Sequence, residues 1–157
     1  VGDIAFVLER AGIDDDLFVA ASDNLFTFPL SDFAADFRRH GRDLLLGTRI
    51  DDVDTLRRYA VAALGGGNRV LSLVEKPQEP QSHIGICAIY LYRRDTAPLF
   101  SAMIAEYRAA GKRPDAPGYF AEWLCKRKEV RVYLASGECV DIGTVESYRE
   151  VCARWTN

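Results

Sequence analysis

The sequence predicts an α/β domain with a mixed sheet. In the first half, continuous apolar runs typical of strands buried on both faces alternate with segments of helical periodicity. In the second half, apolar strands flank glycine-rich turns, a pattern typical of antiparallel hairpins. With 157 residues, 48% of them hydrophobic, the chain can build one real core, so we expect residues 1–157 to form a single domain.

The first half predicts five elements in order. Residues 3–11 form a helix that Gly12 ends, and residues 17–21 form a strand buried on both faces. Ser31 or Asp32 caps a helix that runs to about residue 39. A second buried strand covers residues 44–50, and the acids at 51, 52 and 54 open a short helix.

The second half predicts a hairpin, further strands and three helices. Strands 59–64 and 70–74 are joined by a Gly-Gly-Gly-Asn loop that permits positive φ angles. The remaining expected elements are a strand at 84–92, helices at 96–110 and 118–126, strands at 130–134 and 138–142 around a turn at 136–137, and a helix at 145–155 capped by Thr144.

Composition excludes several function classes. A net charge of −3 and a pI of about 5.4 argue against a nucleic-acid binder, which needs a basic face. No run of 18 apolar residues could span a membrane and no signal peptide is visible, so we expect a cytoplasmic protein. The four cysteines (Cys87, Cys125, Cys139 and Cys152) form no C-x-x-C pair. They predict reduced, mostly buried thiols and no zinc site.

Asp23 directly follows a predicted buried strand. Ligands of open α/β sheets bind at the carboxyl ends of strands, and a carboxylate there can hold Mg²⁺. The string Asp23-Asn24 equally fits a plain turn.

Glu75 and Lys76 end another strand and precede Pro77. The proline stops the strand ladder and favours an extended backbone at Lys76, whose ammonium group suits a phosphate. Glu75 would point the opposite way, where it could accept hydrogen bonds from sugar hydroxyls. The alternative is an exposed ion pair at a strand end.

Asp141 lies between Val140 and Ile142, just before Gly143-Thr144 and a helix start. A carboxylate in so apolar a stretch needs a partner, such as a metal ion or a helix N-terminus. Helix capping alone would also explain it.

Three other strings resemble ligand-binding motifs but lack essential parts. Gly47-Thr48-Arg49 lacks the glycines of a phosphate loop and predicts a strand end. The glycines at 65–67 are not followed by Lys-Ser or Lys-Thr, so they form no Walker loop. Asp14-Asp15-Asp16 precedes a strand and predicts a solvated turn.

In this order, the strings resemble the sugar-1-phosphate nucleotidyltransferase family, which includes glucose-1-phosphate thymidylyltransferases and mannose-1-phosphate guanylyltransferases. The resemblance covers nearly the whole chain. It is carried by Phe18-Val19-Ala20-Ala21-Ser22-Asp23-Asn24, Val70-Leu71-Ser72-Leu73-Val74-Glu75-Lys76-Pro77, Ile89-Tyr90-Leu91-Tyr92, Val140-Asp141-Ile142-Gly143-Thr144 and Tyr148.

The resemblance implies a Rossmann-like mixed sheet of the nucleotide-diphospho-sugar transferase type. It implies attack by a sugar 1-phosphate on the α-phosphorus of a nucleoside triphosphate, which gives a nucleotide sugar and pyrophosphate. Asp23 and Asp141 would hold Mg²⁺, and Asp23, Lys76 and Asp141 would be the catalytic residues. Asn24, Ala60, Glu75 and Lys76 would bind substrate. Ala60 stands where many relatives have glycine, which would crowd the sugar pocket.

The sequence also departs from the family pattern. Family members begin with a glycine-rich loop that contains Gly-x-Gly-x-Arg and a downstream Pro-Lys, and nothing at the start of this chain matches that pattern. We therefore expect a C-terminal portion of a nucleotidyltransferase domain that is inactive, or nearly so, in isolation. The exposed sheet edge would favour a homo-oligomer.

Two alternatives remain at this stage. A glycosyltransferase of similar fold would need an Asp-x-Asp metal motif at a strand end, where Asp14 to Asp16 are badly placed. A non-catalytic module that senses sugar phosphates or nucleotide sugars would share the binding residues without turnover.

Overall fold

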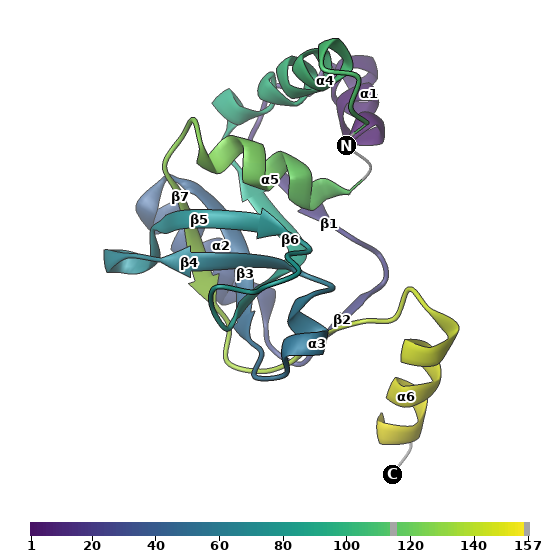
Figure 1. The fold of residues 1–157 in the computed structure, drawn as a ribbon. Coiled ribbons are helices and arrows are strands. Elements are labelled where there is room, and N and C mark those ends of the chain that lie inside the picture. Colours follow the sequence, from purple (N-terminus) through teal and green to yellow (C-terminus); the bar gives the residue numbers. More distant parts are fainter. Residues whose placement is uncertain (114–115, 156–157) are drawn as a thin grey trace.

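A mixed six-stranded sheet forms the centre of the computed structural model, which describes residues 1–113 and 116–155 (Figure 1). The strands of this sheet are β1 (Leu17–Ala20), β3 (Asp43–Arg49), β4 (Ala60–Leu64), β5 (Val70–Glu75), β6 (Ile84–Tyr92) and β7 (Val130–Leu134). Strands β2 (Asn24–Phe26) and β8 (Cys139–Asp141) form a separate two-stranded sheet. The helices are α1 (Gly2–Ala11), α2 (Leu30–His40), α3 (Val53–Leu56), α4 (Leu99–Ala109), α5 (Pro117–Cys125) and α6 (Val145–Trp155), with short 3₁₀ turns η1 (Gly66–Asn68) and η2 (Arg94–Thr96).

Strand β6 organises the sheet because it pairs with three other strands. Along one edge it pairs with β3, and the order across the sheet is β5-β4-β6-β3-β7. Its other edge is shared, with β4 beside Gly85 and Ile86 and β1 beside residues 89–92. Strands β4 and β1 therefore diverge from one another along β6, which leaves a gap at the middle of the sheet. The β3–β7 pair is parallel and the others are antiparallel, so the predicted mixed α/β sheet is confirmed.

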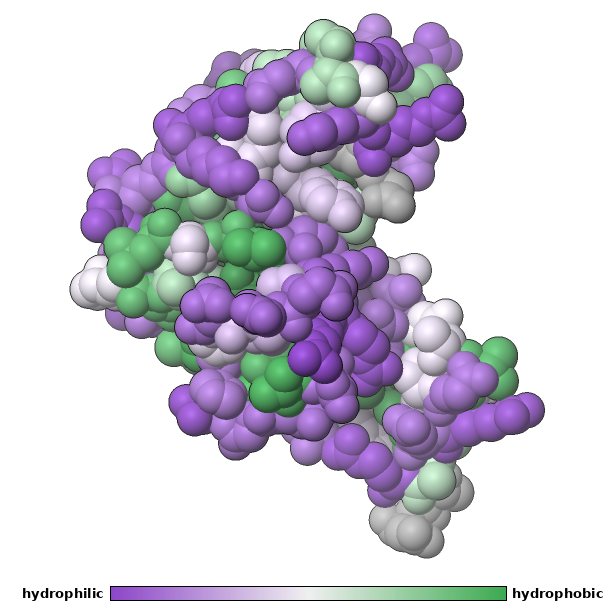
Figure 2. Space-filling model, in the orientation of Figure 1, coloured by the Kyte–Doolittle hydropathy of each residue, from purple (hydrophilic) through white to green (hydrophobic). Residues whose placement is uncertain are grey.

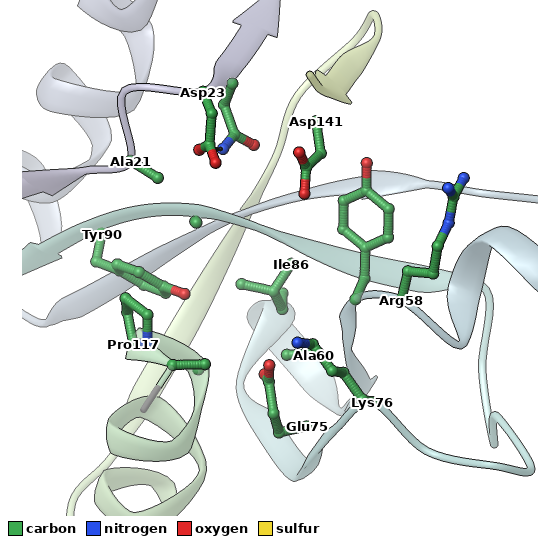
Figure 3. A pocket seen from close by; sticks show the side chains of 15 residues that line it. Ala21, Asp23, Arg58, Ala60, Glu75, Lys76, Ile86, Tyr90, Pro117 and Asp141 are labelled. Atoms are coloured by element: carbon green, nitrogen blue, oxygen red, sulfur yellow. Dashed lines mark hydrogen bonds between the residues drawn. The ribbon is translucent and has the colours of Figure 1, made fainter. Parts of the chain in front are cut away.

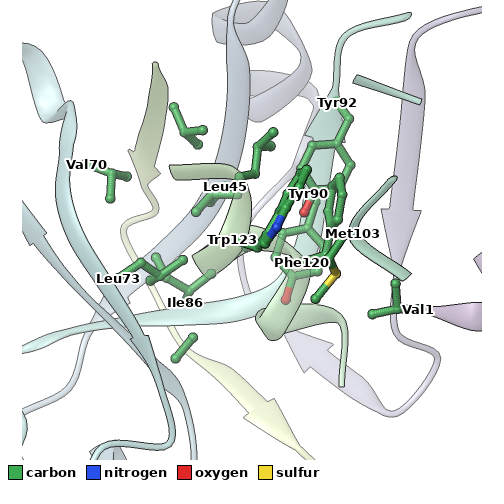
Figure 4. Packing of buried hydrophobic residues seen from close by; sticks show 14 of the residues in the cluster. Val1, Leu45, Val70, Leu73, Ile86, Tyr90, Tyr92, Met103, Phe120 and Trp123 are labelled. Carbon is green, nitrogen blue, oxygen red and sulfur yellow. The ribbon is translucent and has the colours of Figure 1, made fainter. Parts of the chain in front are cut away.

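Helices cover both faces of the sheet. Successive residues of a strand point to opposite faces, so Leu44 and Leu46 pack under α2 with Phe33 and Phe37. Leu45 faces the other side. The second and larger core there joins residues of β6 to α4 and α5, and includes Tyr90, Tyr92, Phe100, Met103, Phe120 and Trp123 (Figure 4). This core fixes α5 beside β5 and so sets one wall of the gap.

Most predicted elements are confirmed. Strands 84–92 and 130–134 and helix 145–155 have the expected bounds, and Thr144 caps α6 by accepting a hydrogen bond from Ser147 N at 3.0 Å. The 65–68 segment does join an antiparallel hairpin, with positive φ at Gly67 and Asn68. Of the cysteines, Cys87 and Cys139 are buried, and all four are unpaired thiols.

Four expectations were wrong. Strand β1 is not buried on both faces, because it lies at the sheet edge with Phe18 53% exposed. Neither Ser31 nor Asp32 caps α2, which begins at Leu30 after Pro29. The segments at 130–134 and 138–142 do not pair across their turn, since β7 joins β3 and β8 joins β2. The fourth concerns Lys76 and belongs to the site below.

The surface is largely hydrophilic in the view of Figure 2, with an apolar patch over β4 and β5 where Leu71 and Val74 are exposed. The same view shows the molecule hollowed between its upper helices and α6. No helix among residues 1–113 and 116–155 is long and apolar enough to cross a membrane.

Candidate functional site

A cavity of about 260 Å³ lies in the gap where β1 and β4 diverge (Figure 3). Ile86, Ala88 and Tyr90 of β6 form its floor. The six residues selected from the sequence all line it: Asp23, Asn24, Ala60, Glu75, Lys76 and Asp141. They come from four segments that lie far apart in the chain, so the fold converges on this one cavity.

The acidic side of the cavity depends on the small β2–β8 sheet. Asn24 is the register partner of Asp141, and Ile142 N donates to Asp23 O at 2.8 Å. Each carboxylate is also fixed by a local hydrogen bond. Gly143 N donates to Asp141 Oδ1 at 2.6 Å, and Asn24 Nδ2 donates to Asp23 Oδ1 at 3.1 Å. Backbone pairing of β2 with β8 therefore brings Asp23 and Asp141 to the same side of the cavity.

Gly143 shows how close the two carboxylates are. A Cβ atom on this residue would lie 2.9 Å from Asp23 Oδ2 and 3.0 Å from Asp141 Oδ1. Two carboxylates around one point are the hard oxygen ligands that Mg²⁺ takes in phosphate-binding sites, where phosphate and water complete the coordination. The donor set fits such a cation. Among the described residues, no group of three or more His, Cys, Asp or Glu side chains could hold a metal ion by itself.

Glu75 and Lys76 face the acidic pair across the cavity (Figure 3). The expected extended backbone at Lys76 is wrong, since its φ is +48°. Lys76 N donates to Tyr59 O at 3.1 Å, which extends the β4–β5 ladder by one bond and holds the residue in this uncommon conformation. Because the backbone turns at Lys76, its side chain and that of Glu75 line the same cavity instead of pointing opposite ways.

Ala60 lies beside Lys76 and is only 4% exposed. Ala60 is the first residue of β4, which lies between β5 and β6, and it pairs with Glu75 on one side and Ile86 on the other. Its methyl group lines the cavity. A glycine here would widen the cavity by that methyl group. The methyl group of Ala60 therefore narrows this cavity, and its effect on a bound sugar stays a prediction.

Sequence reasoning missed Tyr59, Tyr90 and the start of α5. Tyr59 OH donates to Cys139 O at 3.4 Å, and burial chiefly raises the pKa of its phenol to about 12, so it is neutral at physiological pH. Burial, and after it the charge of Glu75, raises the pKa of Tyr90. At the start of α5, Ala116, Pro117 and Gly118 form a wall. Tyr59 directly precedes Ala60, and Tyr90 belongs to one of the strings that carry the family resemblance, so both could have been selected from the sequence. No sequence signal indicates that α5 reaches the cavity.

The acidic run at residues 14–16 takes no part in the cavity. Arg94 donates to Asp14 and, through its backbone N at 2.8 Å, to Asp16 Oδ1. Arg93 donates to Asp16 Oδ2 at 2.9 Å. Asp14 and Asp16 are thus exposed or half-buried ion-pair partners of arginines. They do not provide the Asp-x-Asp metal motif that a glycosyltransferase would need at this cavity.

Known proteins resemble this chain over most of its length. Residues 4–157 match the family model described as nucleotidyl transferase. The chain belongs to the nucleotidyl transferase family. A glucose-1-phosphate adenylyltransferase of Thermomicrobium roseum is 26% identical over 86% of this chain and 31% of its own length. A glucose-1-phosphate thymidylyltransferase of Streptomyces griseus is 29% identical over 88% of this chain and 38% of its own length.

The fold of the family is also that of solved structures. A UDP-glucose pyrophosphorylase, solved with UDP-glucose, superposes with a TM-score of 0.76 at 16% identity, over 98% of this chain and 60% of that one. The nucleotide-diphospho-sugar transferase fold expected from the sequence is thereby confirmed. This member of the family spans about a third of the length of the curated relatives it matches.

Proposed function

We propose that this chain carries the sugar-phosphate and metal half of a sugar-1-phosphate nucleotidyltransferase site. The observation that carries the proposal is the convergence of Asp23, Glu75, Lys76 and Asp141 on one cavity. Two carboxylates side by side, with an ammonium group opposite them, match a divalent cation and a phosphate between them. The related adenylyl- and thymidylyltransferases, whose names specify glucose 1-phosphate, support this substrate class.

Each polar side chain has a role that its chemistry suggests. Lys76 would bind the phosphate of the sugar 1-phosphate as a point charge. Glu75, next to it, would accept hydrogen bonds from sugar hydroxyls, while Asn24 and Ala60 would border the substrate. Asp23 and Asp141 would hold Mg²⁺, which when bound neutralises charge on the phosphates.

The chemistry asks mainly for positioning. A phosphate oxygen of the sugar 1-phosphate attacks the α-phosphorus of a nucleoside triphosphate, a P–O bond forms, and the bond to the leaving pyrophosphate breaks. No covalent enzyme intermediate is needed, so Lys76 and Glu75 contribute by holding the nucleophile in line. The buried floor residues Ile86 and Tyr90 would exclude water beneath the reacting groups.

Calorimetric titration of the 157-residue chain with glucose 1-phosphate, glucose and inorganic phosphate tests the sugar-phosphate half. We expect glucose 1-phosphate to bind more tightly than either of its parts, because Glu75 and Lys76 would then act together. Lys76→Ala should weaken glucose 1-phosphate binding by about tenfold or more, the value of one charged hydrogen bond. Absence of glucose 1-phosphate binding by the wild-type chain would refute the proposal.

Turnover is a separate question from binding. The one Gly-x-Gly-x-Arg string in the sequence, at residues 65–69, joins β4 to β5 and does not line the cavity, so no such loop stands ready to hold a triphosphate there. We therefore propose that the chain binds sugar 1-phosphate but, by itself, releases pyrophosphate far more slowly than the roughly 1 s⁻¹ or more of typical enzymes. Pyrophosphate release at an ordinary enzymatic rate would contradict this part of the proposal.

A further inference from the structure

Gly118, in the first turn of α5, lies against the carboxylate of Glu75. A Cβ atom on Gly118 would be 1.8 Å from Glu75 Oε2 and 3.2 Å from Oε1. Real side chains never approach so closely. The carboxylate therefore occupies the place that any side chain at position 118 would take, and Gly118 is itself buried.

Local backbone structure does not explain a glycine at this position. Gly118 lies inside a nine-residue helix, and its φ is not in the left-handed region. Alanine would be more favourable there, because glycine loses more conformational freedom when a helix forms. The contact with the Glu75 carboxylate is the feature of the structure that explains why residue 118 has no side chain.

The same helix also fixes the backbone of Glu75. Glu122 Oε2 accepts a hydrogen bond from Glu75 N at 3.2 Å, while its Oε1 accepts one from Lys126 Nζ at 2.8 Å. Glu75 is thus hydrogen-bonded to α5 at its main chain through Glu122, and its carboxylate lies against Gly118 of the same helix. Helix α5 therefore determines where this carboxylate stands in the cavity.

We propose that Gly118 is a positioning residue for sugar recognition: its lack of a side chain lets the Glu75 carboxylate stand where sugar hydroxyls bind. This inference rests on the proposed function, and deepens it by assigning the first turn of α5 to recognition of the hydroxyls. Gly118 would not affect binding of the phosphate group, which Lys76 would bind. The Glu75 carboxylate is the far end of a flexible side chain, so Gly118→Ala should displace this carboxylate without unfolding the protein.

Binding measurements on four proteins test the inference: wild type, Gly118→Ala, Glu75→Ala and the double variant. We expect Gly118→Ala to weaken glucose 1-phosphate binding about tenfold, the value of one hydrogen bond to a charged group, and to leave inorganic phosphate binding unchanged. In the Glu75→Ala background it should cause no further loss, because no carboxylate remains to be displaced. Gly2→Ala is a matched control, since Gly2 is also helical but has open space around it.

Two binding results would overturn the inference. One is wild-type affinity of Gly118→Ala for glucose 1-phosphate. The other is an equal loss of affinity from Gly118→Ala with and without Glu75, which would mean that position 118 acts independently of the carboxylate.

Thermal unfolding of the same proteins separates this inference from the proposed function. Gly118→Ala should raise Tm in the Glu75→Ala background, and should raise it less, or lower it, when Glu75 is present. Equal Tm shifts in both backgrounds would overturn the inference. If the wild-type chain bound no glucose 1-phosphate, the proposed function would fail. Unequal Tm shifts would still support the conclusion that Gly118 makes room for the Glu75 carboxylate.

Discussion

At the residue scale, the left-handed backbone of Lys76 is the clearest departure from local preference. Its φ of +48° is uncommon for a residue with a side chain. Such conformations persist where the surrounding structure over-determines them, as the hydrogen bond from Lys76 N to Tyr59 O does here. The strain is concentrated at the residue proposed to bind phosphate.

Replacing Lys76 measures this strain. Glycine adopts positive φ freely, so we expect Lys76→Gly to have a free energy of unfolding about 1 kcal/mol higher than Lys76→Ala. Both variants should lose phosphate binding alike. Urea denaturation of the two variants gives the comparison, and equal stabilities would show that the backbone at position 76 is unstrained.

The candidate site was partly predictable from the sequence for a physical reason. Asp23, Lys76 and Asp141 each lie at or next to the end of an apolar strand, and sheets gather ligand groups at strand ends. The backbone at Lys76 could not be read this way, because the preference imposed by Pro77 is overridden by the bond to Tyr59. The role of Gly118 depends wholly on which strand its helix packs against.

At the scale of elements, Asp43 ties the start of β3 to the turn that leads into α4. Its side chain is fully buried. It accepts hydrogen bonds from Arg93 N at 2.7 Å and from Thr96 Oγ1 at 2.9 Å, and pairs with Lys128 at 2.9 Å. One carboxylate therefore joins β3, η2 and the segment before β7.

Removal of this carboxylate should loosen all three segments. We expect Asp43→Ala to lower the free energy of unfolding by about 3 kcal/mol, because buried donors and an ion pair lose their partner. Asp54→Ala is the control, since Asp54 is exposed and pairs with Arg57 one turn away, an arrangement worth about 1 kcal/mol or less. Urea denaturation measures both, and a similar small loss from each variant would contradict the role of Asp43.

Elements were easier to predict than their pairing. Strand β6 was recognised with its correct bounds, because nine residues of nearly continuous apolar sequence leave little choice. The partners of β7 and β8 were not, because the turn at Ser136-Gly137 suggests a local hairpin. In the structure β7 adds to β3 in parallel, and β8 pairs with β2 more than a hundred positions away. Such long-range choices depend on core packing that no local pattern contains.

At the scale of the whole molecule, β1 presents an apolar edge. Within the described ranges it pairs only with β6, and Phe18 on it is 53% exposed. Phe6 and Val7 of the neighbouring α1 are also exposed. Its four residues include no charge or proline that would block edge pairing.

We therefore expect the chain to self-associate through this edge. Phe18→Lys should lower the average molecular mass that light scattering measures at high protein concentration towards that of the monomer. The reason is that a charged residue disfavours pairing at an edge strand. Val53→Lys, at an exposed apolar residue of α3, should leave the association unchanged. A wild-type chain that stays a monodisperse monomer at every concentration would rule out this interface.

The central claim is that Asp23, Lys76 and Asp141 form one metal-dependent substrate site. The most direct test is calorimetric titration of the chain with UDP-glucose, with and without Mg²⁺, for wild type and Asp141→Ala. The account predicts binding that strengthens with Mg²⁺ in the wild type and loses that dependence in the variant, because one of two carboxylate ligands is gone. Binding that is equally strong without Mg²⁺, or unchanged in Asp141→Ala, would contradict it.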